Sequence, residues 1–152
     1  MIAEGQEAPD FELTSDAGET VKLSALRGKP VVLYFYPKDD TPGCTTQACG
    51  NRDAWGEFER AGAVVLGVSP DDERSHEKFR SKYDLPFTLL ADTDHSVAEQ
   101  YGVWAEQKYM GRTYWGVLRS TFVIDADGNI KRAMHKVKPD THAVDVLATL
   151  RA

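Results

Sequence analysis

Residues 31–44 have the sequence VVLYFYPKDDTPGC, in which an apolar run is followed by a polar loop and a cysteine. The six apolar, β-branched or aromatic residues that open this stretch are typical of a strand buried on both faces of a sheet. Pro37 ends the strand, and Thr41 followed by Pro42 is typical of the start of a helix. We therefore expect a strand, a short loop and a helix that carries Cys44 in its first turn.

The segments around this stretch alternate between strand and helix patterns. The expected elements, in chain order, are strands over 11–13, 21–23 and 31–36, a helix over 41–60, a strand over 63–68, a helix over 72–83, a strand over 87–90, a helix over 96–101, strands over 118–124 and 130–135, and a helix over 140–151. This order predicts parallel central strands and an antiparallel hairpin near the C-terminus. We expect a single domain over residues 1–152, an α/β sandwich of thioredoxin-like fold with a central mixed sheet, flanking helices and an N-terminal β-hairpin.

The composition argues against several classes of protein. The chain has 152 residues and a net charge of −6, without a basic block, so a nucleic-acid partner is disfavoured. The N-terminal residues lack the apolar core of a signal peptide, and no apolar stretch approaches the roughly eighteen residues of a membrane span. We therefore expect a cytoplasmic protein with no nucleic-acid or membrane partner.

The chain contains two cysteines, Cys44 and Cys49, which are five residues apart. In a reducing compartment, such a close pair is more often redox-active or metal-binding than structural. The four histidines are scattered singly and no second cysteine pair is present, so the ligands of a zinc site are missing. We expect no metal and no cofactor.

The position of Cys44 favours a reactive thiol. A cysteine attacks as the thiolate, and the free N–H groups and dipole of a helix N-terminus stabilise an anion. Gly43 has no side chain and would let another molecule approach the sulfur. The alternative is that Cys44 is a small buried apolar residue without chemical function.

Residues 35–49, FYPKDDTPGCTTQAC, resemble the peroxiredoxin signature Pro-x-x-x-Thr-x-x-Cys, and the match is with the Q-type, or bacterioferritin comigratory protein, branch. Further stretches resemble the same family, in the same order: 8–13, 28–31, 67–69, 87–92, 101–104 and 119–125. The resemblance implies a thiol peroxidase that reduces hydrogen peroxide and organic hydroperoxides. In that role Cys44 attacks a peroxide oxygen and becomes a sulfenic acid.

The resemblance also implies roles for three other residues. Thr41 would hydrogen-bond the peroxide while its hydroxyl accepts a backbone N–H, and Pro37 would shield the pocket from water. Arg119 would hold the thiolate and stabilise the leaving oxygen, although a strand-end arginine can also be simply solvated. Arg52 lies roughly 12 Å along the helix from Cys44, too far to replace Arg119.

Cys49 would be the resolving thiol, forming an intramolecular disulfide that thioredoxin or a similar dithiol reduces. On an intact helix, five residues give about 7.5 Å of rise and place the two side chains on different faces, so this disulfide requires the helix to unwind. Asn51 departs from the apolar residue that the resemblance leads us to expect, and we expect it to loosen the helix. If Cys49 is inert, the enzyme uses one cysteine and an external thiol. An intrachain resolving cysteine favours a monomer.

Two other functions remain open from the residues. A general thiol–disulfide oxidoreductase usually has Cys-x-x-Cys, which is absent here, and a thioredoxin-like binding or chaperone module needs no chemistry at all. The aromatic stretch 104–115 is expected to line a site for bulky hydroperoxides or a reductase, or to pack over the core. Asp39 and Asp40 are interpreted as solvated loop charges.

Overall fold

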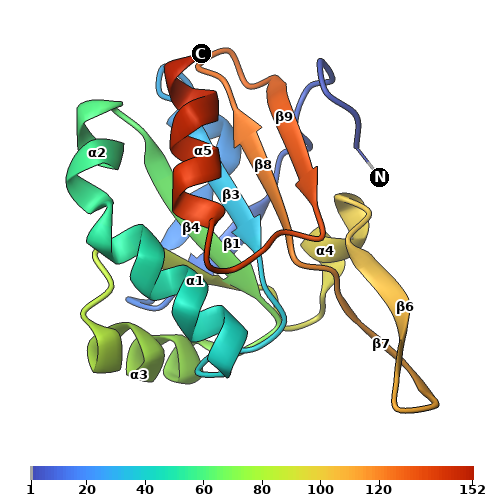
Figure 1. Ribbon diagram of the computed structural model, residues 1–152. Helices are drawn as coiled ribbons and strands as arrows, with labels where there is room; N and C mark the ends of the chain where they lie inside the picture. Colours follow the sequence, from blue (N-terminus) through green and yellow to red (C-terminus); the bar gives the residue numbers. More distant parts are fainter. Residues whose placement is uncertain (1) are drawn as a thin grey trace.

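Strand β3 (Val31–Phe35) lies in the interior of a seven-stranded sheet, as its unbroken apolar sequence predicts. The computed structural model describes residues 2–152 (Figure 1). β3 pairs in parallel with β4 (Val64–Ser69) and antiparallel with β8 (Ser120–Ile124). All five residues of β3 are buried, so the strand carries side chains into the cores on both faces of the sheet.

The sheet has the strand order β2-β1-β5-β4-β3-β8-β9. The strands not yet introduced are β1 (Glu12–Ser15), β2 (Thr20–Lys22), β5 (Thr88–Ala91) and β9 (Ile130–His135). β3, β4 and β5 are parallel, whereas the N-terminal hairpin and the pair β8–β9 run antiparallel to their neighbours. The expected mixed sheet, with an N-terminal hairpin on one edge, is therefore confirmed.

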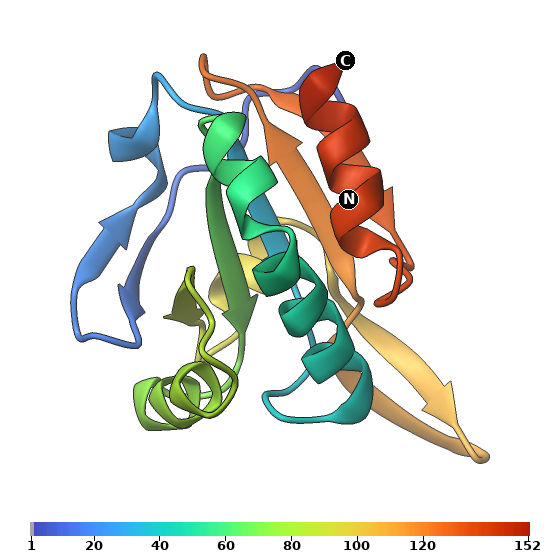
Figure 2. The ribbon, with the colours of Figure 1, turned by 60° about the vertical axis from the view of Figure 1, so that its left-hand side comes forward.

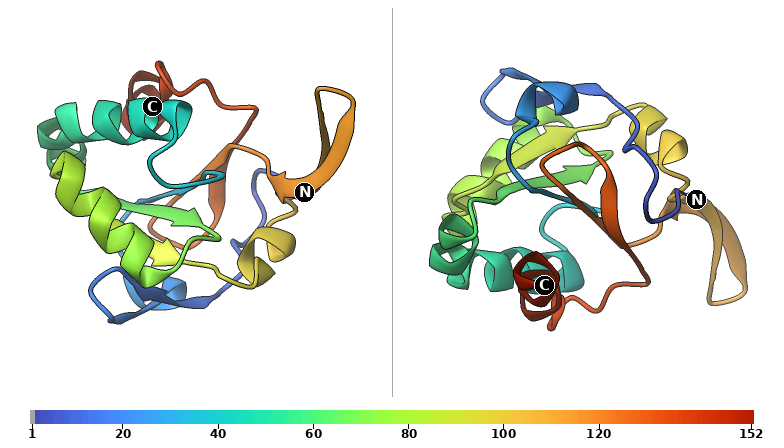
Figure 3. Two further views of the ribbon diagram at one scale, coloured as in Figure 1. Left: turned by 90° about the horizontal axis from the view of Figure 1, so that it is seen from below. Right: turned by 90° about the horizontal axis from the view of Figure 1, so that it is seen from above.

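Helices cover both faces of this sheet. They are α1 (Pro42–Asp53), α2 (Trp55–Arg60), α3 (Glu73–Tyr83), α4 (Ser96–Gln100), α5 (His142–Arg151) and a 3-10 helix over Leu23–Leu26. Figures 2 and 3 show α1, α2, α3 and α5 on one side of the sheet, with α4 on the other. No helix within residues 2–152 has the length and apolar character that crossing a bilayer requires.

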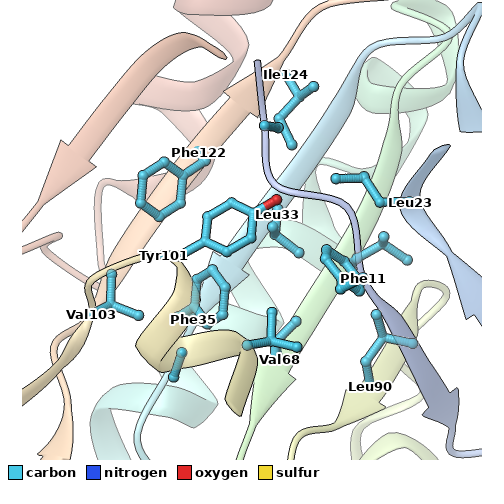
Figure 4. Close-up of a cluster of buried hydrophobic side chains, with 14 of the residues drawn as sticks. Phe11, Leu23, Leu33, Phe35, Val68, Leu90, Tyr101, Val103, Phe122 and Ile124 are labelled. Atoms are coloured by element: carbon cyan, nitrogen blue, oxygen red, sulfur yellow. The ribbon is translucent and has the colours of Figure 1, made fainter. Parts of the chain in front are cut away.

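Side chains alternate along β3 between two hydrophobic cores. Leu33 and Phe35 enter the core that Tyr101 and the N-terminal segment complete (Figure 4). Tyr34 and the following Tyr36 enter the second core, beneath α1, α3 and α5. Because Cys44 belongs to this second core, α1 lies against the sheet through the residue expected to be the nucleophile.

The helix expected over 41–60 is divided into two. α1 ends at Asp53, and Ala54 has φ −96° and ψ 10° before α2 begins. The division lets the ring of Trp55 pack 6.1 Å from that of Phe87 while Phe58 is fully buried. Side-chain packing against the sheet therefore overrides the continuous helical pattern of the sequence.

The segment 104–117 forms a separate two-stranded hairpin, β6 (Trp104–Tyr109) and β7 (Arg112–Val117), which projects from the body (Figure 1). Met110 at its tip is 86% exposed and Tyr109 is 68% exposed. Packing of this stretch over the core, one of the two alternatives considered above, is therefore wrong for the tip of the hairpin.

His142, the first residue of α5, ties this helix to α1 and to β8. Burial, with a smaller effect from the charge of Arg119, lowers the pKa of His142 to about 3, so the ring is neutral. A neutral imidazole has one donor and one acceptor nitrogen. Nδ1 donates to Asn51 Oδ1 at 3.0 Å, and Nε2 accepts from the Thr121 hydroxyl at 2.8 Å. Asn51 therefore fastens α1, and the expectation that it loosens the helix is wrong.

Replacing His142 should change how stability depends on pH. In the folded chain His142 titrates near 3, and in the unfolded chain near 6.5, so the unfolded state binds the extra proton between these values. Stability should therefore fall as the pH decreases through this window, by about 2 kcal/mol between pH 7 and pH 5 from this residue alone.

The measurement is urea unfolding of the wild type and of His142→Gln at several pH values. The variant should lack this component of the pH dependence, while contributions from other groups, including His76, remain in both proteins. If the free energy of unfolding changed with pH by the same amount in both proteins, His142 would not be held neutral in the fold.

Candidate active site

The loop between β3 and α1 places Cys44 in the first turn of α1, as the sequence predicts. Thr41 has the extended backbone of an N-cap, with φ −96° and ψ 157°, and Pro42 is the first helical residue. The N–H groups of a first turn have no partners within the helix, so this end of α1, where Cys44 lies, carries partial positive charge. The Cys44 side chain is 2% exposed, so little water competes for this field.

Thr41 does not cap the helix through its side chain, contrary to expectation. Its hydroxyl donates to the carbonyl oxygen of Lys38 at 2.9 Å and accepts no backbone N–H of α1. The first-turn N–H groups therefore stay available to an anion. The oxygen of the Thr41 hydroxyl also keeps its lone pairs available to accept a hydrogen bond from a bound molecule.

Arg119 contacts the sulfur of Cys44. Its Nη2 lies 3.3 Å from Cys44 Sγ, and its Nη1 donates to Gln47 Oε1 at 2.6 Å. The register of the sheet explains this meeting, because Phe35 at the end of β3 pairs with Ser120 at the start of β8. Arg119, which precedes Ser120, therefore lies beside the loop that leads into α1. A guanidinium here favours the thiolate and can stabilise a developing oxyanion.

Gly43 makes room for Arg119. A Cβ atom at this position would lie 3.1 Å from Arg119 Nη2 and 3.6 Å from Cγ of Pro139. We expected Gly43 to admit another molecule to the sulfur, and in the structure a side chain of the protein itself uses that space. A side chain at position 43 would therefore require the Arg119 guanidinium to shift by a few tenths of an ångström.

Gln47 is a site residue that sequence reasoning missed. It lies three residues after Cys44, and therefore on the same face of α1, where it is fully buried and holds Arg119. Its Nε2 has no hydrogen-bond partner within residues 2–152. The available signal was the spacing of a polar residue one turn after the nucleophile.

Within residues 2–152, the other expected residues make no hydrogen bond to the Cys44 sulfur. Cys49 is partly exposed near the C-terminal half of the intact α1, and both cysteines are free thiols. Pro37 is exposed at the end of β3. Arg52 points away from Cys44, donating to the carbonyl oxygen of Tyr83 and to Asp53.

Asp39 is buried, which corrects its interpretation as a solvated loop charge. Its carboxylate accepts hydrogen bonds from the hydroxyls of Tyr36 and Ser75 and lies 2.7 Å from His76 Nδ1. Burial alone would lower the pKa of His76, but the hydrogen bond and charge of Asp39 raise it above its usual value. The carboxylate and imidazole therefore form an internal ion pair that fixes the loop to α3. The local sequence gave no sign of it.

The nitrogen and oxygen atoms of Asp39, Asp71 and His76 lie within 4.8 Å of one another, a spacing that could hold a metal ion. Hydrogen bonds within the protein already use these groups: Asp71 accepts from the Asp39 backbone and the Ser69 hydroxyl, and His76 Nε2 contacts the Leu90 carbonyl. We interpret the cluster as a structural network.

A groove of about 310 Å³ separates the β6–β7 hairpin from the loop after β3. Its lining residues are Pro37, Lys38, Pro70, Trp104, Gln107, Tyr114, Trp115, Gly116 and Val117. The aromatic stretch thus borders a groove that begins at Pro37, consistent with the alternative in which it lines a site.

A thioredoxin-type sheet whose first crossover helix begins with an arginine-bound cysteine defines a thiol-dependent peroxidase of the oxidoreductase class. The comparisons with known proteins agree. Residues 4–133 match the model of the AhpC/TSA family, and the chain belongs to this family, in its Q-type peroxiredoxin branch.

Two relatives illustrate the similarity in sequence. A putative peroxiredoxin bcp of Coxiella burnetii is 52% identical over 149 residues, covering 98% of this chain and 99% of the relative. Peroxiredoxin Bcp of Bacillus subtilis is 52% identical over 147 residues, covering 97% and 94%.

Solved structures show the same fold. A structure of peroxiredoxin Q from Xanthomonas campestris has a TM-score of 0.91 and 38% identity and covers 97% of this chain and 96% of its own. The BcpB structure from Mycobacterium tuberculosis has a TM-score of 0.89 and 38% identity, with coverage of 99% and 97%. The predicted thioredoxin-like fold is confirmed.

Gly43→Ala should slow the oxidation of Cys44 by hydrogen peroxide. The added methyl group would displace the Arg119 guanidinium from the sulfur without removing it. We expect a decrease of roughly tenfold in the second-order rate, less than the ~10²–10³ typical of deleting a preorganised donor. Stopped-flow tryptophan fluorescence measures this rate.

The matched control is Gly50→Ala in the same helix, where a Cβ atom would meet nothing within 4 Å. The control should be oxidised at the wild-type rate. Equal rates for Gly43→Ala and the wild type would show that the position of Arg119 does not govern the reaction.

Proposed function

We propose that this chain reduces hydrogen peroxide and organic hydroperoxides with Cys44 as the peroxidatic nucleophile. The observation that carries the proposal is the 3.3 Å contact between Arg119 Nη2 and Cys44 Sγ at the N-terminus of α1. A buried sulfur beside a permanent cation and free N–H groups has what a thiolate needs. The reaction breaks the O–O bond, transfers one oxygen to sulfur as a sulfenic acid and releases an alcohol or water after protonation.

In this mechanism, Arg119 stabilises the negative charge that develops on the leaving oxygen. The Thr41 hydroxyl donates to Lys38, so its oxygen accepts a hydrogen bond from the O–H of the hydroperoxide. Pro37, which lines the groove, is proposed to limit the access of water to the site. The groove bordered by Pro37 leaves space for an organic substituent. A structural study of the Xanthomonas campestris relative concerns the alkyl peroxide reduction activity of that protein.

Cys49 is proposed to resolve the sulfenic acid as an intramolecular disulfide. Its thiol attacks the Cys44 sulfur, an S–S bond replaces the S–O bond, and water leaves. α1 must unwind for this step, and its packing makes unwinding inexpensive. Cys44, Gln47 and Ala48 are the buried residues of the helix up to Gly50, and Ala48 is the one with an ordinary apolar side chain.

We also propose that thioredoxin or a similar dithiol protein reduces the disulfide, and that the enzyme acts as a cytoplasmic monomer. Both cysteines belong to one helix, so resolution needs no second subunit. A chain with only two cysteines, five residues apart, suits a reducing compartment with a dithiol donor.

Mixing the reduced protein with a slight excess of hydrogen peroxide tests the roles of the cysteines. We expect fast oxidation that survives Cys49→Ser and disappears in Cys44→Ser. Non-reducing peptide mapping of the oxidised wild type should find the Cys44–Cys49 bridge. Oxidation at the slow rate of a small free thiol would contradict the peroxidase assignment, and a missing bridge would contradict the resolving role.

Gly50→Ala should slow the formation of the disulfide while leaving the oxidation of Cys44 unchanged. Alanine stabilises a helix interior by about 0.5–1 kcal/mol relative to glycine, so unwinding of α1 becomes less frequent. The peroxide-independent phase that follows oxidation should become roughly two- to fivefold slower, since 1.4 kcal/mol is a factor of ten. Stopped-flow fluorescence separates the two phases, and an unaltered second phase would indicate that resolution does not require the helix to open.

A further inference from the structure

The C-terminal end of α3 holds the chain on both sides of the segment that carries the two cysteines. We define this segment as residues 41–50. Immediately before it, the Asp40 carboxylate accepts from the Tyr83 hydroxyl at 2.6 Å and from Lys82 Nζ at 2.7 Å. Shortly after it, Arg52 Nη1 donates to the carbonyl oxygen of Tyr83 at 2.8 Å. One residue, Tyr83, thus binds the chain at both ends of the segment.

Each end also has a buried attachment. Before the segment, the backbone N–H of Asp39 donates to Asp71 at 2.8 Å, and the Asp39 carboxylate pairs with His76 at 2.7 Å. After it, fully buried Asn51 accepts from His142 at 3.0 Å. Hydrogen bonds that are shielded from water are stronger than exposed ones, so the buried Asp39–His76 and Asn51–His142 contacts reinforce the exposed contacts of Tyr83.

The segment itself has a single hydrogen-bonding attachment to distant parts of the fold. Within residues 2–152, its long-range side-chain hydrogen bonds are the two from Arg119, to Cys44 and to Gln47. The hydroxyls of Thr41 and Thr46 bond to nearby carbonyls of Lys38 and Pro42. Oxidation changes the sulfur of Cys44 and therefore acts directly on the contact with Arg119, one of the two long-range side-chain hydrogen bonds of this segment within residues 2–152.

We propose that Tyr83 is a positioning residue for the resolving step: it fixes both ends of residues 41–50, so that the oxidised helix unwinds between the attachments and no further. This inference rests on the proposed disulfide between Cys44 and Cys49. The nine helical residues 42–50 rise about 14 Å, whereas nine extended residues span about 30 Å, so the segment is long enough for the two sulfurs to meet while its ends stay in place.

Fixed ends have a consequence for the catalytic cycle. They restrict the conformations of the unwound segment, which lowers its entropy and favours the return to the helix after the disulfide is reduced. They also keep the Asp39 network and α2 intact while residues 41–50 rearrange. Fixed ends therefore slow the formation of the disulfide and speed the return of the helix after the disulfide is reduced.

Amide hydrogen exchange of the full-length protein, reduced and after oxidation by peroxide, tests this boundary without a variant. The amide of Thr45, which bonds to the Thr41 carbonyl, reports on the segment. The amides of Asp39, bonded to Asp71, and of Ala61, bonded to Glu57, report on the two flanks. Oxidation should remove the protection of Thr45 and leave that of Asp39 and Ala61. Loss of protection at either flank would overturn the proposal.

Two variants release one end each. Tyr83→Phe removes the hydroxyl that holds Asp40, and Arg52→Met removes the bond to the Tyr83 carbonyl. Because each release gives the unwound segment more freedom, the peroxide-independent phase should become about two- to fivefold faster. The oxidation of Cys44 should stay within about twofold of the wild type, a split between the two phases that a general loss of stability would not produce.

Tyr109→Phe and Arg74→Met serve as matched controls, because both side chains are exposed and lie outside these contacts. Both should behave like the wild type. Wild-type second phases in Tyr83→Phe and Arg52→Met would overturn the role of Tyr83. If peptide mapping finds no Cys44–Cys49 bridge, the resolving role of Cys49 is wrong and this inference is wrong with it. If the bridge forms but the amides of Asp39 or Ala61 lose their protection, only the positioning role of Tyr83 is overturned.

Discussion

The contact between the Arg119 guanidinium and the Cys44 sulfur joins two parts of the chain that are 75 residues apart. It depends on the antiparallel register of β3 and β8, which brings the start of β8 to the loop after β3. Gly43, which has no side chain, leaves space for the guanidinium in this position. An anion at a helix N-terminus gains from both the backbone N–H groups and this cation, so the chemistry of the site follows from how the sheet is paired.

The surroundings of α1 combine firm attachment with weak packing. The loop before the helix is fixed by the Asp39–His76 ion pair, and the residues near its C-terminal end are fixed by Asn51 and Arg52. Between them the helix buries little apolar surface, because Gln47 occupies a core position and Ala48 is small. Such an element can be formed in the resting protein and can open locally, as the proposed disulfide between Cys44 and Cys49 requires.

Local patterns predicted much of this structure correctly. The strand over 31–36, the loop and the position of Cys44 in the first turn follow from near neighbours in the sequence: an apolar run, a proline and an N-cap residue. The other strands of the large sheet and the helices α3, α4 and α5 were also predicted to within a few residues, whereas the hairpin of β6 and β7 was not predicted. The expected helix over 41–60 was divided at Ala54, because the packing of Trp55 and Phe58 against the sheet outweighs helical periodicity.

The sequence by itself therefore determined the order of the elements, the mixed sheet, and a cysteine in the first turn of a helix. Only the tertiary structure decided which side chains surround that helix. It buried Asp39 and joined Asn51 to His142 by a hydrogen bond. It also placed the Arg119 side chain in the space beside Gly43, where it donates a hydrogen bond to Gln47. The physical reason is the separation along the sequence between the residues that interact. Caps, turns and strand patterns are set by residues a few positions apart. The hydrogen bonds around α1 join residues 37 to 91 positions apart, so they form only once the sheet has brought these residues together.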